Sequence, residues 1–234
     1  MNLVEKRFSQ KIELAISAKT ASELYGLSFG NRMDDLLATG LKPKTLTYLY
    51  GTGVGRTMNS LCGRAINSFG GRSVFIDAAN SFDPYLMVNE CNIRKNSSDA
   101  AEKLLRSIML SRVFTCYQLE GLVVEKLGDV IKSEERNQGA IKSVFVSGID
   151  AVFDEQDNTK EETDRLQFLI ASALRKIASD KASRVLFVVA SSANVCKPVL
   201  EKCDIGIKMT RSKNGKKEAT LMKHYSKRFA SMEM

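Results

Sequence analysis

A glycine-rich segment that joins an expected strand to an expected helix constrains the fold of this chain most. Residues 45–50 (TLTYLY) are β-formers, and they run directly into GTGVGRT. Residues 58–69 then carry apolar side chains at helical spacing, and Gly70 and Gly71 end that helix. A strand that turns through glycines into a helix favours an α/β fold, because parallel neighbours need crossover connections.

Strands and helices continue to alternate along the chain. We expect further strands at residues 73–77, 143–147 and 184–190, and helices around residues 100–111, 118–132 and 163–179. Because crossover helices cover the faces of a parallel sheet, this order predicts an α/β fold with a mostly parallel central sheet and helices on both faces.

The two ends of the chain depart from this alternation. The first residues have an apolar spacing that suits one or two short amphipathic helices, so we predict an N-terminal helical segment (1–26) before a core (27–234). Near the other end, residues 205–210 and 218–223 flank Asn214-Gly215, which is a strong hairpin signal. A C-terminal antiparallel hairpin should therefore extend one edge of the sheet.

Composition excludes several classes of protein. With 234 residues, 44% of them hydrophobic and only 3 Pro, the chain is large enough for one full-sized core. Its longest purely apolar run, residues 185–190, is far shorter than the roughly 18 residues of a membrane helix, and no leader pattern opens the sequence. The five cysteines form no C-x-x-C pair. We therefore expect a cytoplasmic protein with reduced thiols, without a disulfide framework, a zinc site or membrane association.

Charge is distributed unevenly along the chain. The 35 Lys and Arg against 27 Asp and Glu give a net charge of +8. The last 34 residues hold nine basic and four acidic side chains, and so carry +5 of that charge. A basic patch is typical of a nucleic-acid-binding protein, but many basic proteins bind no nucleic acid. Charge alone leaves both interpretations open.

The order of six segments resembles the RecA/RadA recombinase superfamily. In chain order they are LSFGNRMDDLLATGLKPKTLTYLYGTGVGRT, GGRSVFIDAANSFDP, SRVFTCYQLEGLV, SVFVSGIDAVF, VLFVVASS and ATLMKHYSKR. The chain is most similar to archaeal RadB-type recombinase paralogues, which consist of the ATPase core without an extra DNA-binding domain. The resemblance covers about residues 27–228 and implies a RecA-like P-loop ATPase core.

The phosphate loop of that family reads G-x-x-x-x-G-K-[ST], and its backbone N–H groups hold phosphates while its hydroxyl binds Mg²⁺. The resemblance assigns nucleotide binding here to Gly51, Gly53, Gly55, Arg56 and Thr57. Arg56 replaces the lysine, and either the loop opens one residue short at Gly51 or Tyr50 replaces its first glycine. Two interpretations stay open: residual binding of ATP with Mg²⁺, or a remnant glycine turn without a cofactor, which is our main expectation.

The positions that would perform ATP hydrolysis have changed. Ala79 stands where the family has the glutamate that activates water, and Ser147 stands where it has the metal-binding aspartate. Ser192 is too short for the γ-phosphate sensor. Asp77 either keeps a functional role or caps a turn, and Asp150 is either a displaced metal ligand or the start of a turn. A methyl and a hydroxyl replace neither base nor carboxylate, so we expect no catalytic residues and no metal site.

A phosphate loop without a ligand needs another source of order, because a bound nucleotide would otherwise stabilise the fold. We expect Tyr50 to fill the space that phosphate would occupy. We also expect the Arg56 guanidinium to pair with the Asp77 carboxylate.

Nucleic-acid contact is expected at the basic C-terminal end. The loop at residues 154–164, which the resemblance would place near DNA, is strongly acidic and would repel phosphates. The candidate DNA-binding residues are Lys208, Arg211, Lys213, Lys216, Lys217, Lys223, Lys227 and Arg228. The alternative is a solvated charged hairpin. His224, the only histidine, is expected on the surface of a strand without a catalytic role.

The resemblance implies a catalytically degenerate recombinase paralogue that assists homologous recombination or DNA repair. Its partners would be DNA and repair proteins such as a RadA-type recombinase. One alternative is a weak DNA-dependent ATPase; another is a KaiC-like interaction module that binds no DNA and docks through the acidic loop at 154–164. Phe8 is followed by Ser-Gln-Lys rather than by the aromatic-x-x-alanine plug of recombinases, so no long filament is expected.

Overall fold

Eight strands and their connecting helices make up the part of the chain that this computed structural model describes: residues 26–30, 33–37, 40–90, 98–136, 139–153, 158–180, 184–211, 217–224 and 230–233. The strands are β1 (Leu46–Gly51), β2 (Arg72–Asp77), β3 (Ile108–Arg112), β4 (Ile141–Ser147), β5 (Leu186–Ser191), β6 (Ile205–Arg211), β7 (Lys217–His224) and β8 (Ala230–Glu233). The α-helices are α2 (Met33–Leu36), α3 (Val54–Phe69), α4 (Pro84–Glu90), α5 (Ser98–Arg106), α6 (Cys116–Glu120), α7 (Leu127–Arg136), α8 (Lys160–Ala178) and α9 (Lys197–Lys202). A π-helical segment, η1 (Gly121–Lys126), and a 3₁₀ turn, η2 (Ala151–Phe153), complete them.

The helical segment expected at 1–26 lies outside the described residues, except for Gly26.

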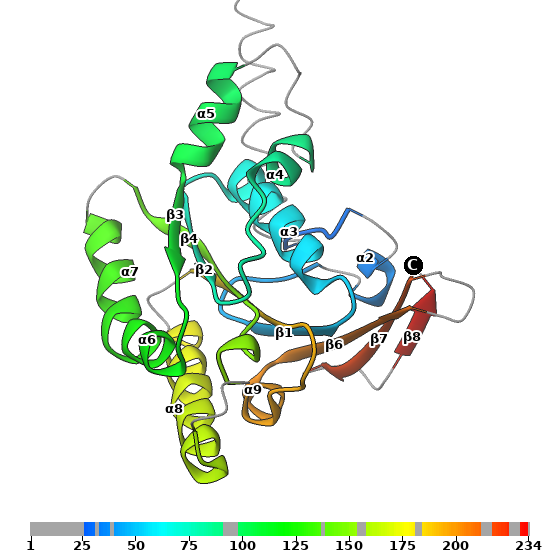
Figure 1. The fold of residues 1–234 in the computed structure, drawn as a ribbon. Coiled ribbons are helices and arrows are strands. Elements are labelled where there is room, and N and C mark those ends of the chain that lie inside the picture. Colours follow the sequence, from blue (N-terminus) through cyan, green and yellow to red (C-terminus); the bar gives the residue numbers. More distant parts are fainter. Residues whose placement is uncertain are drawn as a thin grey trace, which may run out of the picture.

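The strands form one sheet in the order β3-β2-β4-β5-β1-β6-β7-β8 (Figure 1). The pairs from β3 through β6 are all parallel, whereas β6–β7 and β7–β8 are antiparallel. The expected mostly parallel sheet with a C-terminal antiparallel hairpin is therefore confirmed. Strand β8, which the sequence pattern did not indicate, adds one more strand beyond that hairpin.

Side chains alternate across the sheet and build two apolar layers. On β1, Leu46, Tyr48 and Tyr50 belong to one layer and Leu49 to the other. Helices α6, α8 and α9 pack on the first layer, and α3 and α4 pack on the second (Figure 1). The expectation of helices on both faces is confirmed. Within the described residues, no helix is long and apolar enough to cross a bilayer.

The helix expected at 100–111 is wrong in its second half. Helix α5 ends at Arg106, and the residues that follow form β3, an edge strand that pairs only with β2 among the described strands. Its side chains are partly exposed throughout, from Ile108 to Arg112. Because an edge strand of this kind lacks a clean alternation of buried and exposed positions, its sequence does not separate it from the preceding helix.

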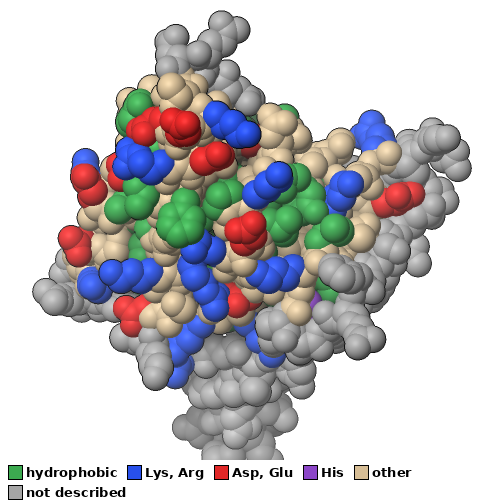
Figure 2. All heavy atoms as spheres, turned by 90° about the horizontal axis from the view of Figure 1, so that it is seen from below, with side chains coloured by type: hydrophobic (Ala, Val, Ile, Leu, Met, Phe, Trp, Pro, Cys, Tyr) green, Lys and Arg blue, Asp and Glu red, His purple; other side chains and the backbone are tan. Residues whose placement is uncertain are grey.

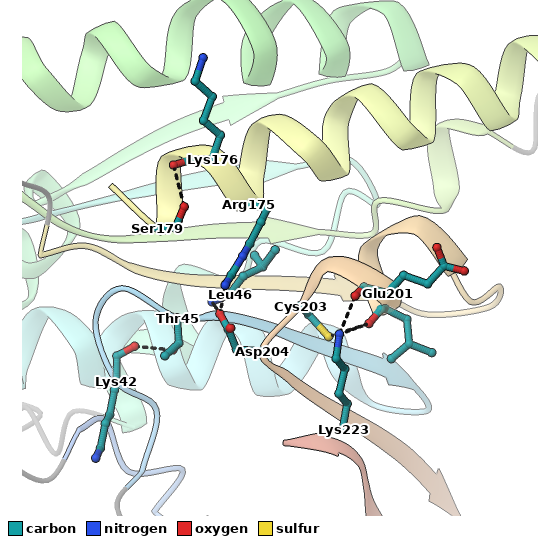
Figure 3. A network of polar contacts seen from close by, with 11 residues as sticks. Lys42, Thr45, Leu46, Arg175, Lys176, Ser179, Glu201, Cys203, Asp204 and Lys223 are labelled. Atoms are coloured by element: carbon teal, nitrogen blue, oxygen red, sulfur yellow. Dashed lines mark hydrogen bonds and ion pairs between the residues drawn. The ribbon is translucent and has the colours of Figure 1, made fainter. Parts of the chain in front are cut away.

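Figure 3 shows a polar network where β1 and β6 begin. The carboxylate of Asp204 accepts a hydrogen bond from the Leu46 N–H (2.9 Å) and forms an ion pair with Arg175 of α8. Lys223 of β7 donates its ammonium hydrogens to two backbone carbonyls in the last turn of α9. These contacts join β1, β7, α8 and α9. The amino-terminal ends of β1 and β6 are therefore stabilised by charged side chains of the chain itself.

Candidate functional site

The carboxyl ends of four parallel strands bring the expected site residues to one edge of the sheet. Gly51 ends β1, Asp77 ends β2, Ser147 ends β4 and Ser191 ends β5. Asp77 lies directly opposite Ser147, and Ser147 lies opposite Ala190. The segments that were expected to meet therefore do meet, and their hydrogen bonds define what this edge can do.

The glycine loop is a tight turn of two residues. Gly51 has φ 107°, and a Cβ at that position would lie 2.1 Å from the carbonyl oxygen of Met209 in β6. Thr52 donates its N–H to the same carbonyl (2.9 Å), and Gly53, with φ 82°, caps α3, which begins at Val54. Helix α3 thus starts four residues earlier than expected. The turn matches the interpretation of a glycine turn that packs strand against helix.

Arg56 and Thr57 lie in the first turn of α3, and their side chains share no hydrogen-bond partner among the described residues. The hydroxyl of Thr57 donates to the Gly53 carbonyl (3.2 Å), as a residue within a helix does. Arg56 is exposed, and within the described residues it forms no ion pair. It lines an open cavity of about 470 Å³ together with Tyr85 and Asn89 of α4.

Asp77 caps the turn that follows β2. Its side chain is buried, and its carboxylate accepts hydrogen bonds from the N–H groups of Ser81 (2.9 Å) and Phe82 (3.0 Å). The expected ion pair with Arg56 is wrong, because the Asp77 carboxylate is hydrogen-bonded by the backbone of this turn instead. The turn-capping interpretation of Asp77 is confirmed.

Tyr50 was expected to fill the phosphate position, and that expectation is also wrong. Its ring stacks on Tyr48 in the apolar layer beneath α8 and α9, with ring centroids 5.4 Å apart. Burial raises the pKa of the Tyr50 phenol. The side chain points to the face of the sheet opposite α3, so the edge is ordered by hydrogen bonds and not by an aromatic plug.

The two positions that the resemblance assigns to the base and the metal ligand lie near Asp77. The buried hydroxyl of Ser147 shares a hydrogen bond with that of Ser81 (2.7 Å), which donates to Asp77 (3.3 Å). The methyl of Ala79 packs against Gly148, where an added Cβ would approach it to 2.2 Å. Ser147 is therefore part of an internal hydrogen-bond network, and Ala79 makes an apolar contact.

Asp150 is held by the loop after β5. Its carboxylate accepts three backbone hydrogen bonds, from Ser192 (3.0 Å), Ala193 (2.8 Å) and Asn194 (2.9 Å). The Ser192 side chain is exposed, while its N–H is used here. Asp150 thus orders a distant loop, a role that the sequence pattern did not indicate, since we expected it to serve its own turn or a metal.

Tyr48 holds the far end of the same loop. Its hydroxyl forms a hydrogen bond with Ser191 and accepts another from the Cys196 N–H (2.8 Å). Burial raises the pKa of the Tyr48 phenol, which favours the neutral form. The loop between Ser191 and Cys196 is therefore fixed at both ends.

A Mg²⁺–nucleotide complex does not fit these residues in the way that the resemblance implies. Mg²⁺ is bound in proteins mainly by oxygen ligands such as carboxylates, and each oxygen of Asp77 and of Asp150 already accepts at least one backbone hydrogen bond, which leaves fewer lone pairs for a metal. In the part of the chain that the structure describes, no three His, Cys, Asp or Glu side chains form a metal-binding group. The two positions that the resemblance assigns to the base and the metal ligand, Ala79 and Ser147, carry a methyl and a hydroxyl.

The basic C-terminal residues divide into three groups. Lys208 and Arg211 are exposed on β6, where they can reach a phosphate backbone. Lys223 is partly buried, and its ammonium is bound to the end of α9, so its assignment to DNA contact is not supported. Lys213, Lys216, Lys227 and Arg228, together with the side chain of Lys217, lie outside the described residues.

Hydrophobic and basic side chains are mixed on the underside of the molecule, where α8 and α9 lie in Figure 1. Figure 2 shows Lys and Arg side chains running between hydrophobic ones on this face. One such contact places the Lys202 ammonium 4.3 Å from the centre of the Phe168 ring. The pairing shows that part of this positive charge is already engaged within the protein.

Asn59 is a residue of the site that sequence reasoning missed. It is buried in α3, donates to the carbonyls of Gly55 (2.8 Å) and Ser81 (2.7 Å), and accepts from the Asp83 N–H (2.8 Å). It therefore fastens the turn after β2 to the helix. An asparagine inside a helix gives no local signal of such a contact.

Comparison with known proteins does not assign a family. A scan of the chain against protein-family models finds no match, and a search of curated proteins finds none either. The function is therefore argued from the order of the segments and from the chemistry of the site.

Proposed function

We propose that this protein is a cytoplasmic recombinase paralogue with a RecA-like core and a lost ATPase, which assists homologous recombination or DNA repair through contacts with DNA and with repair proteins such as a RadA-type recombinase. The proposal rests on the order of the six segments and on the topology of the sheet. In this proposal, the carboxyl ends of the parallel strands keep the fold of an ATPase site but no longer hydrolyse ATP.

One observation carries the loss of the ATPase. Where hydrolysis would need a base and a metal ligand, the chain has Ala79 and Ser147, and the nearby carboxylate of Asp77 is hydrogen-bonded by the backbone of its own turn. Each missing group is typically worth orders of magnitude in rate. We therefore expect negligible turnover of ATP.

Exposed Arg56 supports a second candidate function, the binding of ATP without hydrolysis. Its guanidinium lies beside a cavity of about 470 Å³ and has no ion-pair partner within the described residues. An arginine can hold a phosphate through paired hydrogen bonds without any metal.

Calorimetry with ATP and Mg²⁺, run together with an ATPase assay, separates these possibilities. The main proposal expects neither heat of binding nor turnover, and the Ala79→Glu variant should remain inactive because Ser147 and the tight turn are unchanged. Binding that Arg56→Ala abolishes, without turnover, would establish the second candidate. Turnover at the rate of an active recombinase core, abolished by Thr57→Ala, would refute both.

A further inference from the structure

Two aromatic side chains are exposed at the turn between β3 and α6. The exposed fractions are 66% for Phe114 and 54% for Tyr117, although large aromatic side chains gain most from burial. Thr115 accepts the Gln118 N–H (3.2 Å), and the Gln118 side chain accepts the Phe114 N–H (2.8 Å). These reciprocal bonds fix the turn, so the aromatic side chains are held outward by the backbone.

The Tyr117 ring is also fixed at its tip. Its hydroxyl donates to the Asn158 side chain (3.3 Å), which in turn donates to the sulfur of Cys116 (3.2 Å). Asn158 lies two residues before α8, and Figure 1 shows α6 beside α8. The exposed rings and the start of α8 therefore form one ordered surface, which needs little rearrangement to bind a partner.

The two helices next to these rings, α6 and α8, carry more acidic than basic side chains here, although the chain as a whole is basic. Helix α8 begins with Lys160-Glu161-Glu162 and continues to Asp164 and Arg165, and Glu120 ends α6. Arg165 is committed to Glu162 through two hydrogen bonds (2.8 and 2.9 Å), which lower the pKa of the Glu162 carboxyl. Arg165 also interacts with the Glu120 carboxylate. The local balance is therefore four carboxylates, those of Glu120, Glu161, Glu162 and Asp164, against two cations, Lys160 and Arg165.

We propose that this surface, defined as Phe114, Tyr117, Glu120, Glu161 and Asp164, binds a segment of a partner protein that presents Lys or Arg beside apolar residues. Aromatic faces attract cations, and exposed carboxylates steer a basic partner towards them. A nucleic acid could stack on the rings, but the carboxylates would repel its phosphates. The proposal rests on the proposed function only in giving the protein a protein partner, and it names the chemistry of that partner.

The test uses the full chain and three fluorescently labelled probes: a short peptide that alternates arginine and leucine, a matched peptide of glutamate and leucine, and an oligothymidylate. Anisotropy should detect the arginine peptide and not the glutamate peptide. Phe114→Ala and Tyr117→Ala should each weaken binding of the arginine peptide about tenfold or more, as expected of aromatic residues central to an interface. Asp164→Lys should weaken it further, and the loss should diminish as salt is raised.

Tyr85→Ala is the matched control, because Tyr85 is 81% exposed on α4 without belonging to this surface, and it should leave peptide affinity unchanged. Equal loss in the control, or unchanged affinity in Phe114→Ala and Tyr117→Ala, would overturn the proposal. So would oligothymidylate binding that Phe114→Ala removes. Lys208→Ala with Arg211→Ala should affect only oligothymidylate, so DNA binding at the C-terminal end can fail while the peptide result stands.

Discussion

Two neighbouring regions of the fold differ in their chemistry. One is the edge formed by the carboxyl ends of the parallel strands, whose polar groups are hydrogen-bonded within the protein and which we call the closed edge; the other is the turn after β3, whose aromatic side chains are exposed. Asp77 lies opposite Arg112, and its carbonyl accepts the N–H of Val113, so the exposed turn begins beside the closed edge. At the closed edge, the carboxylates and hydroxyls are hydrogen-bonded within the protein. By contrast, Phe114, one residue beyond Val113, is exposed to solvent. The surface proposed to bind a partner therefore lies where aromatic side chains remain exposed, and not where the motif resemblance is strongest.

Removal of Asp150 tests the closed edge most severely. Asp150→Ala leaves three backbone N–H groups of the loop after β5 without an acceptor, and should lower the free energy of unfolding by about 3 to 5 kcal/mol. Urea denaturation measures this loss. Asp164→Ala, an exposed carboxylate on α8, is the control and should change stability by less than about 0.5 kcal/mol. Equal effects would mean that the edge is not held by its buried carboxylate.

Two glycines of the same turn make a second test. Gly51→Ala places a Cβ on the Met209 carbonyl and should cost about 3 kcal/mol or more, since the clash is with backbone. Gly53→Ala meets no atom within 4 Å and bears only the cost of its positive φ, roughly 1 to 2 kcal/mol. Thermal unfolding of both variants should rank them in this order. The reverse order would show that the turn is not the tight two-residue connection described above.

Much of the fold could be predicted from the sequence, because buried parallel strands have a strong local signal. Residues 143–147 and 184–190 were expected as strands, and β4 and β5 include nearly all of them. The hairpin followed from Asn214-Gly215, because that pair favours a turn of the required twist. Strand β3 was missed because a partly exposed edge strand resembles the helix before it.

Less of the candidate site could be predicted. The sequence showed that Ala79 and Ser147 lack the chemistry of a base and a metal ligand, since that depends on residue type alone. It did not show that Asp150 binds a loop more than forty residues away, or that Tyr50 faces away from α3. Such contacts depend on which strands are neighbours and on which face a side chain lies, and these follow only from the assembled sheet.

The exposed basic side chains of strand β6 provide the next test. If Lys208 and Arg211 contact phosphates, replacing both with Ala should weaken binding of duplex DNA of any sequence and reduce the slope of log affinity against log salt by about 2. Lys223→Ala is the control, because its ammonium is bound to α9; it should lower the melting temperature slightly and leave the slope unchanged. A slope that follows Lys223 instead would place the interface on the other side of β7.

The mildest perturbation is a rise in pH, which tests the burial of the Cys196 and Cys203 thiols without any substitution. Burial raises the pKa of the Cys196 thiol to about 11 from an ordinary value of 9.0, and that of Cys203 to about 12. Above pH 9 the unfolded chain loses these protons while the folded chain keeps them, so the unfolded state is favoured as pH rises. These thiols should therefore add no pH dependence well below pH 9, and stability should fall progressively between pH 9 and 12, with Tyr48 adding to the decline. Cys196→Ala should flatten the part of the curve between pH 9 and 11, as measured by urea unfolding at successive pH values under reducing conditions. A curve that Cys196→Ala leaves unchanged would mean that solvent reaches this thiol, and that the loop held by Tyr48 and Asp150 opens in solution.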